Sequence, residues 1–150
     1  MLREKLIGAW TLESYAEYPV DGSAAFYPLG EDARGMILYT PDGYVSAQLM
    51  RLDRPAFASG DWLRATPDEY RAAARYIAYS GRFEVDEEKG VLTHGMFVSF
   101  FPNWLDGTQL RTARLDGDVL VLAPEAPFVS RDTMVTACLQ WRRARSQAGR

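Results

Sequence analysis

Short runs of β-branched and aromatic residues, separated by tight-turn signals, recur along most of this chain. The clearest pair is GMILY, residues 35–39, and YVSAQLM, residues 44–50, with Pro41-Asp42-Gly43 between them. A Pro-Asp-Gly turn between two β-rich runs is typical of a β-hairpin, because aspartate and glycine adopt the backbone angles that a tight turn requires. We therefore expect these two runs to pair as antiparallel strands.

The same signals continue to the C-terminus and set the fold class. Further turns are expected at residues 86–90 and at Asp116-Gly117, and residues 133–144 form the last of eight predicted strands, before a frayed tail over 145–150. Sequential antiparallel strands lose their exposed edges only by closing, and eight strands leave room for side chains or one small ligand. The predicted fold is all-β: one domain over residues 1–150, an eight-stranded antiparallel up-and-down barrel.

One segment interrupts this pattern between the third and fourth strands. Residues 51–66, RLDRPAFASGDWLRAT, show no sustained period, which predicts a long ordered loop. Thr66, Pro67 and Glu69 then have the spacing of a capping box, in which the Thr and Glu side chains satisfy the first backbone N–H groups of a helix. The sequence predicts one helix over residues 67–76, inserted with the loop between two barrel strands.

The N-terminal region predicts a short helix followed by a strand. Residues 2–6 form the helix, and WTLESYAEYPVDG, residues 10–22, then alternates between two faces as a half-buried strand does. Trp10 lies on the face expected to be buried. Glu13 and Glu17 lie on the other face, which we expect to be in water.

Composition excludes several classes of function. A net charge of −3 provides no basic surface for nucleic acid. No apolar run has the length of a secretory leader or a membrane span, so we expect a cytoplasmic protein without a membrane partner. The single cysteine, Cys138, and the single histidine, His94, exclude an internal disulfide and a Cys/His zinc cluster. We expect no metal and no cofactor, and either a monomer or a homodimer.

Motifs along nearly the whole chain resemble one family. Gly8-Ala9-Trp10 opens the first strand with the Gly-x-Trp of lipocalin and calycin barrels, and LQWRRA, residues 139–144, ends the last strand. Between them stand YTPDGYVSAQLM, RPAFASGD, TPDEY, EVDEEKG and FPNW, in this order. With these motifs the chain resembles the bacterial and fungal lipocalin-like domain family.

The resemblance implies a calycin-type barrel and a ligand. Arg142 or Arg143 is expected to lie across Trp10 in a cation–π contact that closes one end. Members of the family are stand-alone domains often found near secondary-metabolite genes, which implies a hydrophobic ligand or substrate of polyketide-like or terpenoid-like size. The chain departs from secreted lipocalins in having no disulfide and in the position of its helix, which argues against an extracellular carrier.

His94 is the first candidate for chemistry. It shares a face of the fifth strand with Leu92, Met96 and Val98, and we expect this face to point inward. An imidazole has an unperturbed pKa near neutrality, which suits general acid–base work or a hydrogen bond to a ligand carbonyl or hydroxyl. The alternative is a buried imidazole that is satisfied by a neighbouring hydroxyl or backbone carbonyl.

Arg111 is the second candidate. It shares a face of the sixth strand with Ala113 and Leu115. If this face points inward, the buried cation requires an internal carboxylate or tyrosine, or the carboxylate, enolate or carbonyl of a ligand. A register that differs by one residue would instead turn Arg111 toward solvent.

The remaining candidates are polar residues of the third strand and aromatic residues near the barrel rim. Tyr44, Ser46 and Gln48 share the more polar face of their strand, which orients a ligand if it lines the pocket and is otherwise a solvent face. Trp62 and Trp104 lie outside regular strands and are candidates for a lid over the open end. The predicted ligand-binding residues are Ser46, Gln48, Met96, Trp62, Phe101 and Trp104.

Three functions fit these residues. The first is a cofactor-independent cyclase or isomerase, in which the cavity folds the substrate while His94, Arg111 and Tyr44 supply proton transfer and oxyanion stabilisation. The alternative is a non-catalytic binding or carrier protein with the same cavity. A haem-binding barrel with His94 as the axial ligand is the third.

Overall fold

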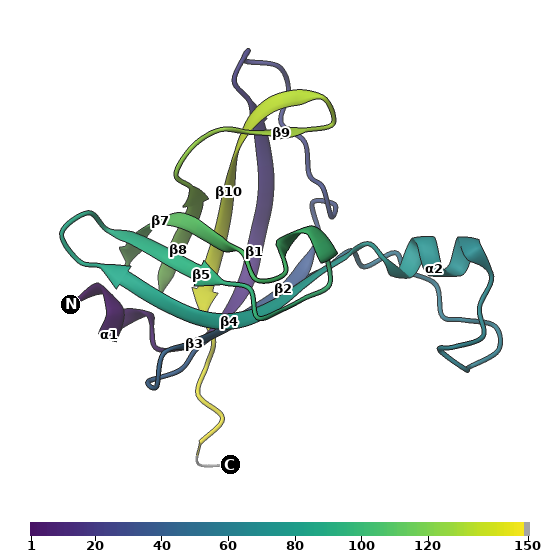
Figure 1. Cartoon of the computed structure of the whole chain (residues 1–150), viewed down its shortest axis with the longest axis horizontal. Helices are drawn as coiled ribbons and strands as arrows, with labels where there is room; N and C mark the ends of the chain where they lie inside the picture. Colours follow the sequence, from purple (N-terminus) through teal and green to yellow (C-terminus); the bar gives the residue numbers. More distant parts are fainter. Residues whose placement is uncertain (149–150) are drawn as a thin grey trace.

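The computed structural model describes residues 1–148, and within them eight strands close into an antiparallel barrel (Figure 1). Successive barrel strands are neighbours, and the first also pairs with the last, which closes the sheet. The predicted all-β up-and-down barrel is therefore confirmed. The barrel strands are β1 (Gly8–Pro19), β2 (Arg34–Tyr39), β3 (Tyr44–Met50), β4 (Tyr76–Asp86), β5 (Val91–Gly95), β7 (Thr108–Asp116), β8 (Val119–Pro124) and β10 (Thr133–Arg143).

Short elements decorate the barrel. The predicted N-terminal helix is α1 (Leu2–Leu6), and the inserted helix is α2 (Pro67–Ala73), which ends before residue 76 because β4 begins there. The structure adds three elements that the sequence did not predict. They are β6 (Val98–Ser99), which pairs with β4, β9 (Phe128–Ser130), which pairs with β10, and the 3-10 turn η1 (Pro102–Trp104).

A bulge in β1 changes which side chains face inward. The pairing of β1 with β10 shifts between Leu12 and Ser14. Beyond this point Glu17 is only 2% exposed, and the Ser130 hydroxyl donates a 2.7 Å hydrogen bond to its carboxylate. The prediction that Glu17 faces water is wrong, because one extra residue in a strand exchanges its two faces. Glu13 lies on the exposed side, as predicted.

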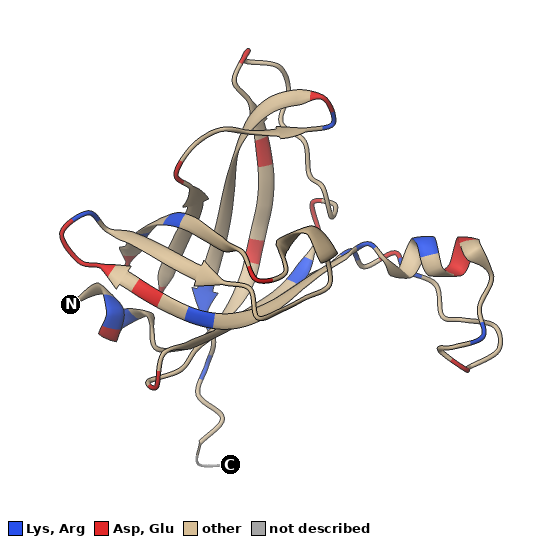
Figure 2. Cartoon of the chain, in the orientation of Figure 1, with Lys and Arg blue, Asp and Glu red and all other residues tan. Residues whose placement is uncertain are grey.

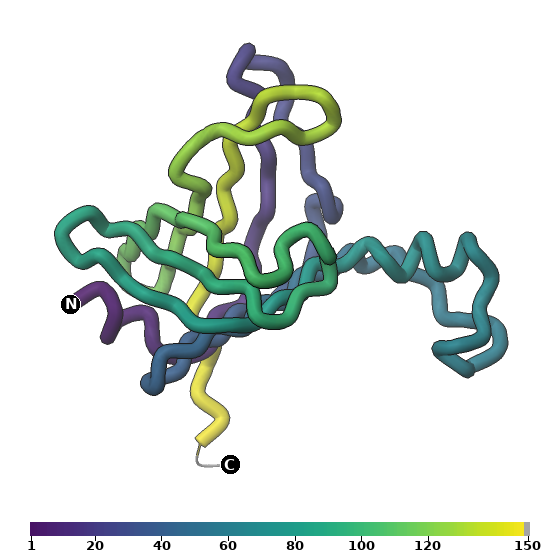
Figure 3. Tube along the Cα trace, viewed as in Figure 1, coloured from purple at the N-terminus to yellow at the C-terminus, as the bar shows by residue number. Residues whose placement is uncertain are grey.

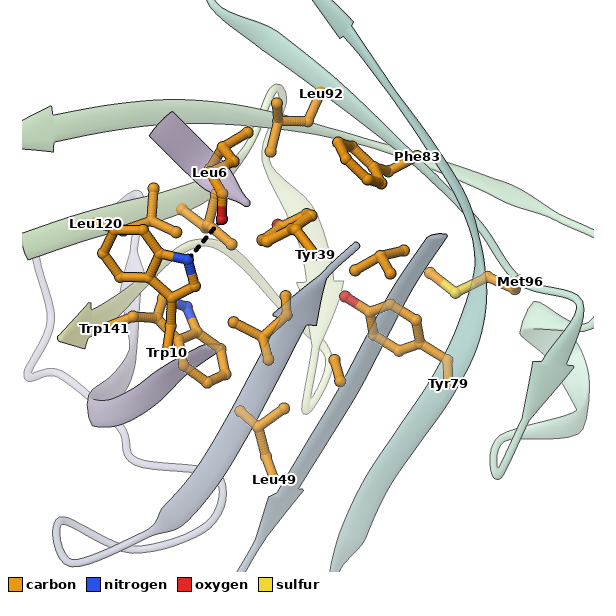
Figure 4. Packing of buried hydrophobic residues seen from close by; sticks show 14 of the residues in the cluster. Leu6, Trp10, Tyr39, Leu49, Tyr79, Phe83, Leu92, Met96, Leu120 and Trp141 are labelled. Atoms are coloured by element: carbon orange, nitrogen blue, oxygen red, sulfur yellow. Dashed lines mark hydrogen bonds between the residues drawn. The ribbon is translucent and has the colours of Figure 1, made fainter. Parts of the chain in front are cut away.

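One end of the barrel is closed by α1 and two tryptophans. Leu6, Trp10 and Trp141 lie together in the core, and the Trp10 indole N–H donates to the Leu6 carbonyl over 2.9 Å (Figure 4). The Arg143 guanidinium lies 4.1 Å from the centroid of the Trp10 ring. The expected cation–π contact is therefore present and uses Arg143.

The insertion between β3 and β4 forms an arm, residues 51–75, that projects away from the barrel (Figures 1 and 3). The predicted capping box is present: Glu69 N–H donates to Thr66 Oγ1 over 3.2 Å, and Thr66 N–H donates to the Glu69 carboxylate over 2.9 Å. Among residues 67–73 none is buried. The arm does not cover an end of the barrel in this arrangement.

Charged residues lie mostly outside the barrel core. Figure 2 shows acidic and basic residues interspersed over the strands, the loops and the arm. Within residues 1–148, no helix has the length and hydropathy needed to cross a membrane. Of the polar and charged residues that the structure describes, Glu17 and His94 are the ones that are buried.

Candidate ligand-binding site

A cavity of about 310 Å³ occupies the barrel between the Trp141 side chain and the end opposite α1. It forms because the inner faces of the strands carry medium-sized apolar side chains that do not fill the interior of an eight-stranded barrel. Its volume is at the lower end of the range for small-molecule sites, so a compact molecule fits it. The apolar lining includes Ile37, Leu49, Ile77, Leu122, Ala137 and Leu139.

Aromatic side chains complete the wall of this cavity. Tyr15, Tyr79 and Trp141 line it from β1, β4 and β10, and Trp104 reaches it from η1. Trp104 packs edge-to-face against Tyr79, with ring centroids 6.3 Å apart. This contact holds an aromatic ring at the cavity edge, where a flat ligand can pack against it.

Arg111 faces this cavity from β7. Exposure alternates along the whole of β7, and Arg111 and Gln109 lie on the side that lines the cavity. The inward register is therefore the one that the strand adopts. The guanidinium donates to the side-chain oxygen of Gln109 and, over 3.0 Å, to the backbone carbonyl of Leu110. Within residues 1–148, no carboxylate lies within 4.0 Å of it.

Trp141 contributes an unsatisfied donor. Its side chain is 1% exposed, and its indole N–H has no acceptor within residues 1–148. The neighbouring Trp10 differs, because its N–H is bonded to the Leu6 carbonyl. A buried donor without a partner costs about 1–3 kcal/mol in lost hydration, so it is uncommon in a folded protein. Less than 1 Å² of the indole nitrogen is accessible, so this donor lies sealed within the wall and the ring, not the N–H, faces the cavity.

His94 is buried in the wall rather than exposed to the cavity. It is 0% exposed, and its Nε2 and Nδ1 atoms each lie 2.9 Å from a hydroxyl, those of Tyr39 and Tyr79 respectively. Burial, and secondarily the positive charge of Arg111, lower the pKa of His94 to about 3. The imidazole is therefore neutral near pH 7. Of the two alternatives for this residue, the geometry is that of the buried imidazole satisfied by neighbouring hydroxyls.

The tyrosines around this network also remain uncharged. Burial raises the pKa of Tyr39 well above its usual value and also raises that of Tyr79. Burial, followed by the nearby Glu17 carboxylate, raises the pKa of Tyr15 to about 12. In the neutral His94 ring one nitrogen carries the proton and the other accepts a hydrogen bond from a tyrosine hydroxyl, so its lone pair is not free for a substrate proton or a haem iron in this arrangement.

The polar residues of β3 lie on the outside of the barrel. Tyr44 is 48% exposed, Gln48 is also exposed, and the apolar residues that alternate with them are buried. Ser46 accepts a 2.7 Å hydrogen bond from Ser80, and Tyr44 and Ser46 border an open groove on the outer surface. This corrects the hypothesis that the polar face of the strand lines the pocket. Tyr44 is therefore not brought together with His94 or Arg111.

The other predicted contact residues divide in the same way. Trp104 lines the cavity. Phe101 is 45% exposed, and its ring packs edge-to-face against that of Trp104, with ring centroids 5.3 Å apart. Met96 is buried in the core beside the outer groove. Trp62 is 75% exposed on the arm and does not line the cavity in this arrangement.

Trp104 and Arg111 are the predicted site residues that line the cavity, and reasoning from the sequence missed the others, among them the three residues Tyr15, Gln109 and Trp141. Tyr15 alternates with Glu13 and Glu17, so the two-residue period of a strand predicts that it faces outward, and no local signal marks the β1 bulge. Trp141 lies in the LQWRRA segment, in which only the arginines were considered. Gln109 is two residues from Arg111, and the two-residue period of a strand places both on one face. Of the three, Gln109 had the clearest available signal.

Comparison with known proteins agrees with this architecture. A 4'-hydroxy-3'-methoxypropiophenone carrier protein, ppsC, from Aspergillus oryzae (strain ATCC 42149 / RIB 40) is 34% identical over 106 residues, which cover 66% of this chain and 96% of that protein. The sequence model of the lipocalin-like domain family matches residues 7–144. Because this match spans most of the chain, the protein belongs to the lipocalin-like domain family.

Proposed function

We propose that this protein is a carrier that holds an apolar small molecule in the barrel cavity without changing it. The observation that carries the proposal is the cavity of about 310 Å³, whose wall is mainly apolar and aromatic and contains a few polar groups. Such a site binds by burying apolar surface and orients its ligand through those few polar groups. The similarity to a carrier of an aromatic ketone supports the same function.

The geometry favours a carrier over an enzyme. General acid–base catalysis requires a group that can exchange a proton near pH 7 within hydrogen-bond reach of the substrate. His94 is bonded on both nitrogens and does not line the cavity, and Tyr44 lies on the outer surface. A cyclase or isomerase would retain only Arg111 of its three proposed catalytic residues. Catalysis by a cyclase or isomerase is therefore the second candidate function, and the cavity-facing Arg111 is the observation that favours it.

The size of the cavity indicates the size of the ligand. A volume of about 310 Å³ suits a molecule of roughly 10–15 non-hydrogen atoms. The ligand that names the similar carrier, 4'-hydroxy-3'-methoxypropiophenone, falls in this range. We infer that an aromatic ketone or related phenol of this size, rather than a long-chain lipid, is carried.

Tryptophan fluorescence tests this function directly, because Trp104 and Trp141 line the cavity. Titration with 4'-hydroxy-3'-methoxypropiophenone should quench the emission in a saturable way, and chromatography with mass spectrometry should recover the compound unchanged. Ala137→Phe places a ring in the cavity and should abolish binding. Thr136→Phe, on the exposed face of the same strand, is the matched control and should bind normally.

Two outcomes would contradict the proposed carrier function. Absence of quenching in the parent protein, with the fold verified by circular dichroism, would mean that the cavity does not accept this class of ligand. Recovery of a new product that depends on the protein would establish an enzyme instead, and Arg111 would then be the first residue to replace.

A further inference from the structure

Among the described residues that line the cavity, Arg111 is the charged one, and this points to the chemistry of the ligand. We infer that the barrel binds aromatic molecules that carry an anionic oxygen group, a carboxylate, phenolate or enolate, and that Arg111 is its counter-ion. The inference rests on the proposed function, since it names the class of ligand for the same cavity. It assigns to Arg111 the role of selecting anions over neutral molecules of equal size.

The first step is the unbalanced charge of Arg111. A guanidinium has five N–H donors, and those of Arg111 are seen to bond only the Gln109 side chain and the Leu110 carbonyl within residues 1–148. Both of these acceptors are neutral. Arg111 is half-buried at this mainly apolar wall, where a cation is favoured by a negative charge or by several strong acceptors that face it. The fold therefore leaves a place for an anion beside this side chain.

The second step is that the protein does not supply that anion. Glu17 is the buried carboxylate among the described residues, but Ser130 bonds it, it does not line the cavity, and it lies more than 4.0 Å from Arg111. Tyr15 and Tyr79 line the cavity, but burial raises their pKa values, so they remain neutral hydroxyls near pH 7. A phenolate of the protein is thus not available as the counter-ion.

The third step is the state of the hydrogen-bond acceptor in the same wall. Gln109, whose side-chain oxygen is the amide acceptor of the cavity wall, already bonds Arg111. The cavity therefore presents the remaining N–H donors of Arg111, and its amide acceptor is occupied. A ligand with several hydrogen-bond acceptor atoms can pair with these N–H groups, whereas a ligand that has only hydrogen-bond donors leaves them unpaired.

The fourth step concerns the rest of the ligand. Tyr79, Trp104 and Trp141 provide ring faces and edges around the cavity, and the remaining lining is aliphatic. Flat aromatic rings pack against such walls with favourable offset or edge-to-face contacts. The class of ligand is therefore a small aromatic body with one anionic group at its edge.

A matched pair of probes separates charge from shape. The carboxylate 2-naphthoate and the neutral ketone 2-acetylnaphthalene have the same ring system and the same number of non-hydrogen atoms. Equilibrium dialysis at pH 7.5 with chromatographic detection gives both affinities. We expect the parent protein to bind 2-naphthoate roughly 10- to 100-fold more tightly than 2-acetylnaphthalene, as a hydrogen-bonded charge pair implies.

Substitution of Arg111 tests the assignment of the counter-ion. Arg111→Met should remove the preference, so that affinity for 2-naphthoate falls by roughly 10- to 100-fold while affinity for 2-acetylnaphthalene changes by less than about threefold. Arg114→Met is the matched control, because Arg114 lies on the exposed face of the same strand. This variant should keep the affinities of the parent protein for both probes.

The outcomes distinguish this inference from the carrier function. Equal affinity of the parent protein for both probes, or an unchanged preference in Arg111→Met, would overturn the anion assignment and leave the carrier function in place. Failure of both probes and of 4'-hydroxy-3'-methoxypropiophenone to bind would overturn both. If Arg111→Met does not fold, Arg111→Gln removes the charge with a polar side chain of similar reach and must show the same loss.

Discussion

At the scale of single residues, the pair of hydrogen bonds made by His94 connects three strands. Tyr39 comes from β2, Tyr79 from β4 and His94 from β5, and both ring nitrogens are used. Neutral imidazole has one donor and one acceptor nitrogen, so one tyrosine hydroxyl donates and the other accepts. The network fixes the Tyr79 ring, which is itself part of the cavity wall. His94 thus contributes to the site by holding a wall residue in place.

This network predicts a pH dependence of stability. The pKa of His94 is about 3 in the folded protein and about 6.5 in the unfolded chain. Between these values the unfolded chain binds more protons, so the free energy of unfolding rises with pH and falls as the pH is lowered. The loss should approach about 1.4 kcal/mol for each pH unit once the pH is below 6. Urea unfolding at several pH values measures it.

The variant His94→Gln isolates this contribution. Glutamine retains one donor and one acceptor for the two tyrosines but does not titrate. The difference in unfolding free energy between the parent protein and the variant should therefore shrink steadily from pH 6.5 downward, because all other titrating groups are common to both. Parallel curves for the two proteins would show that His94 does not carry the predicted proton linkage.

At the scale of elements, β4 changes partner next to a close approach of two backbones. Tyr79 pairs with β6, whereas Phe83 pairs with His94 of β5. At Gly81, between these positions, an added Cβ would lie 1.9 Å from the Gly95 carbonyl oxygen. Only glycine fits here, because the obstacle is backbone and cannot rotate away. This contact lets the β5–β6 segment cross β4 beside the His94 network.

Gly81→Ala should therefore be strongly destabilising. A methyl group at this position forces β4 and β5 apart, and overpacking of this kind costs about 3 kcal/mol or more. Gly22→Ala is the control: its φ of 83° favours glycine, but no atom lies within 4 Å of the added Cβ, so about 1 kcal/mol is expected. Urea unfolding compares the two, and equal effects would contradict the steric argument.

Local signals explain how much of these elements could be predicted. The Pro-Asp-Gly turn and the Thr66 capping box depend on a few adjacent residues, and both are present. The bulge in β1 has no such signal, because its position depends on the pairing with β10, far along the chain. Glu17 was therefore placed on the wrong face, and Tyr15 was missed as a wall residue.

The candidate site was only partly predictable for the same reason. Strand periodicity leaves two choices of face, and the correct one depends on which face the closed barrel encloses. Arg111 had apolar neighbours on its own face, and this face does point inward. For Tyr44 the polarity of the strand face allows either the pocket or the solvent, and the structure places it in solvent because the alternating apolar residues form the core. The partners of His94 come from two other strands, which no spacing in the sequence reveals.

At the scale of the whole molecule, the barrel has one closed and one open end. Trp10 and Arg143 close the end next to α1, and the cavity extends from Trp141 toward the other end. The arm leaves the barrel between the end of β3 and the start of β4, and it extends outward rather than across the opening (Figure 1). Trp62 lies exposed on this arm, so a lid stays a prediction that requires the arm to move over the opening.

Removal of the arm tests this view. The Arg51 N–H donates to the Arg75 carbonyl over 3.1 Å, so the two ends of the arm are already adjacent. Replacement of residues 52–74 by Asn-Gly should therefore join β3 and β4 as a tight hairpin. We expect a folded barrel whose affinity for 4'-hydroxy-3'-methoxypropiophenone and rate of ligand release, followed by stopped-flow fluorescence, stay within about threefold of the parent protein. If the arm is a lid that retains the ligand, its removal should give a different result. Ligand release should become at least about tenfold faster, and association should also become faster, because neither step would require the arm to open.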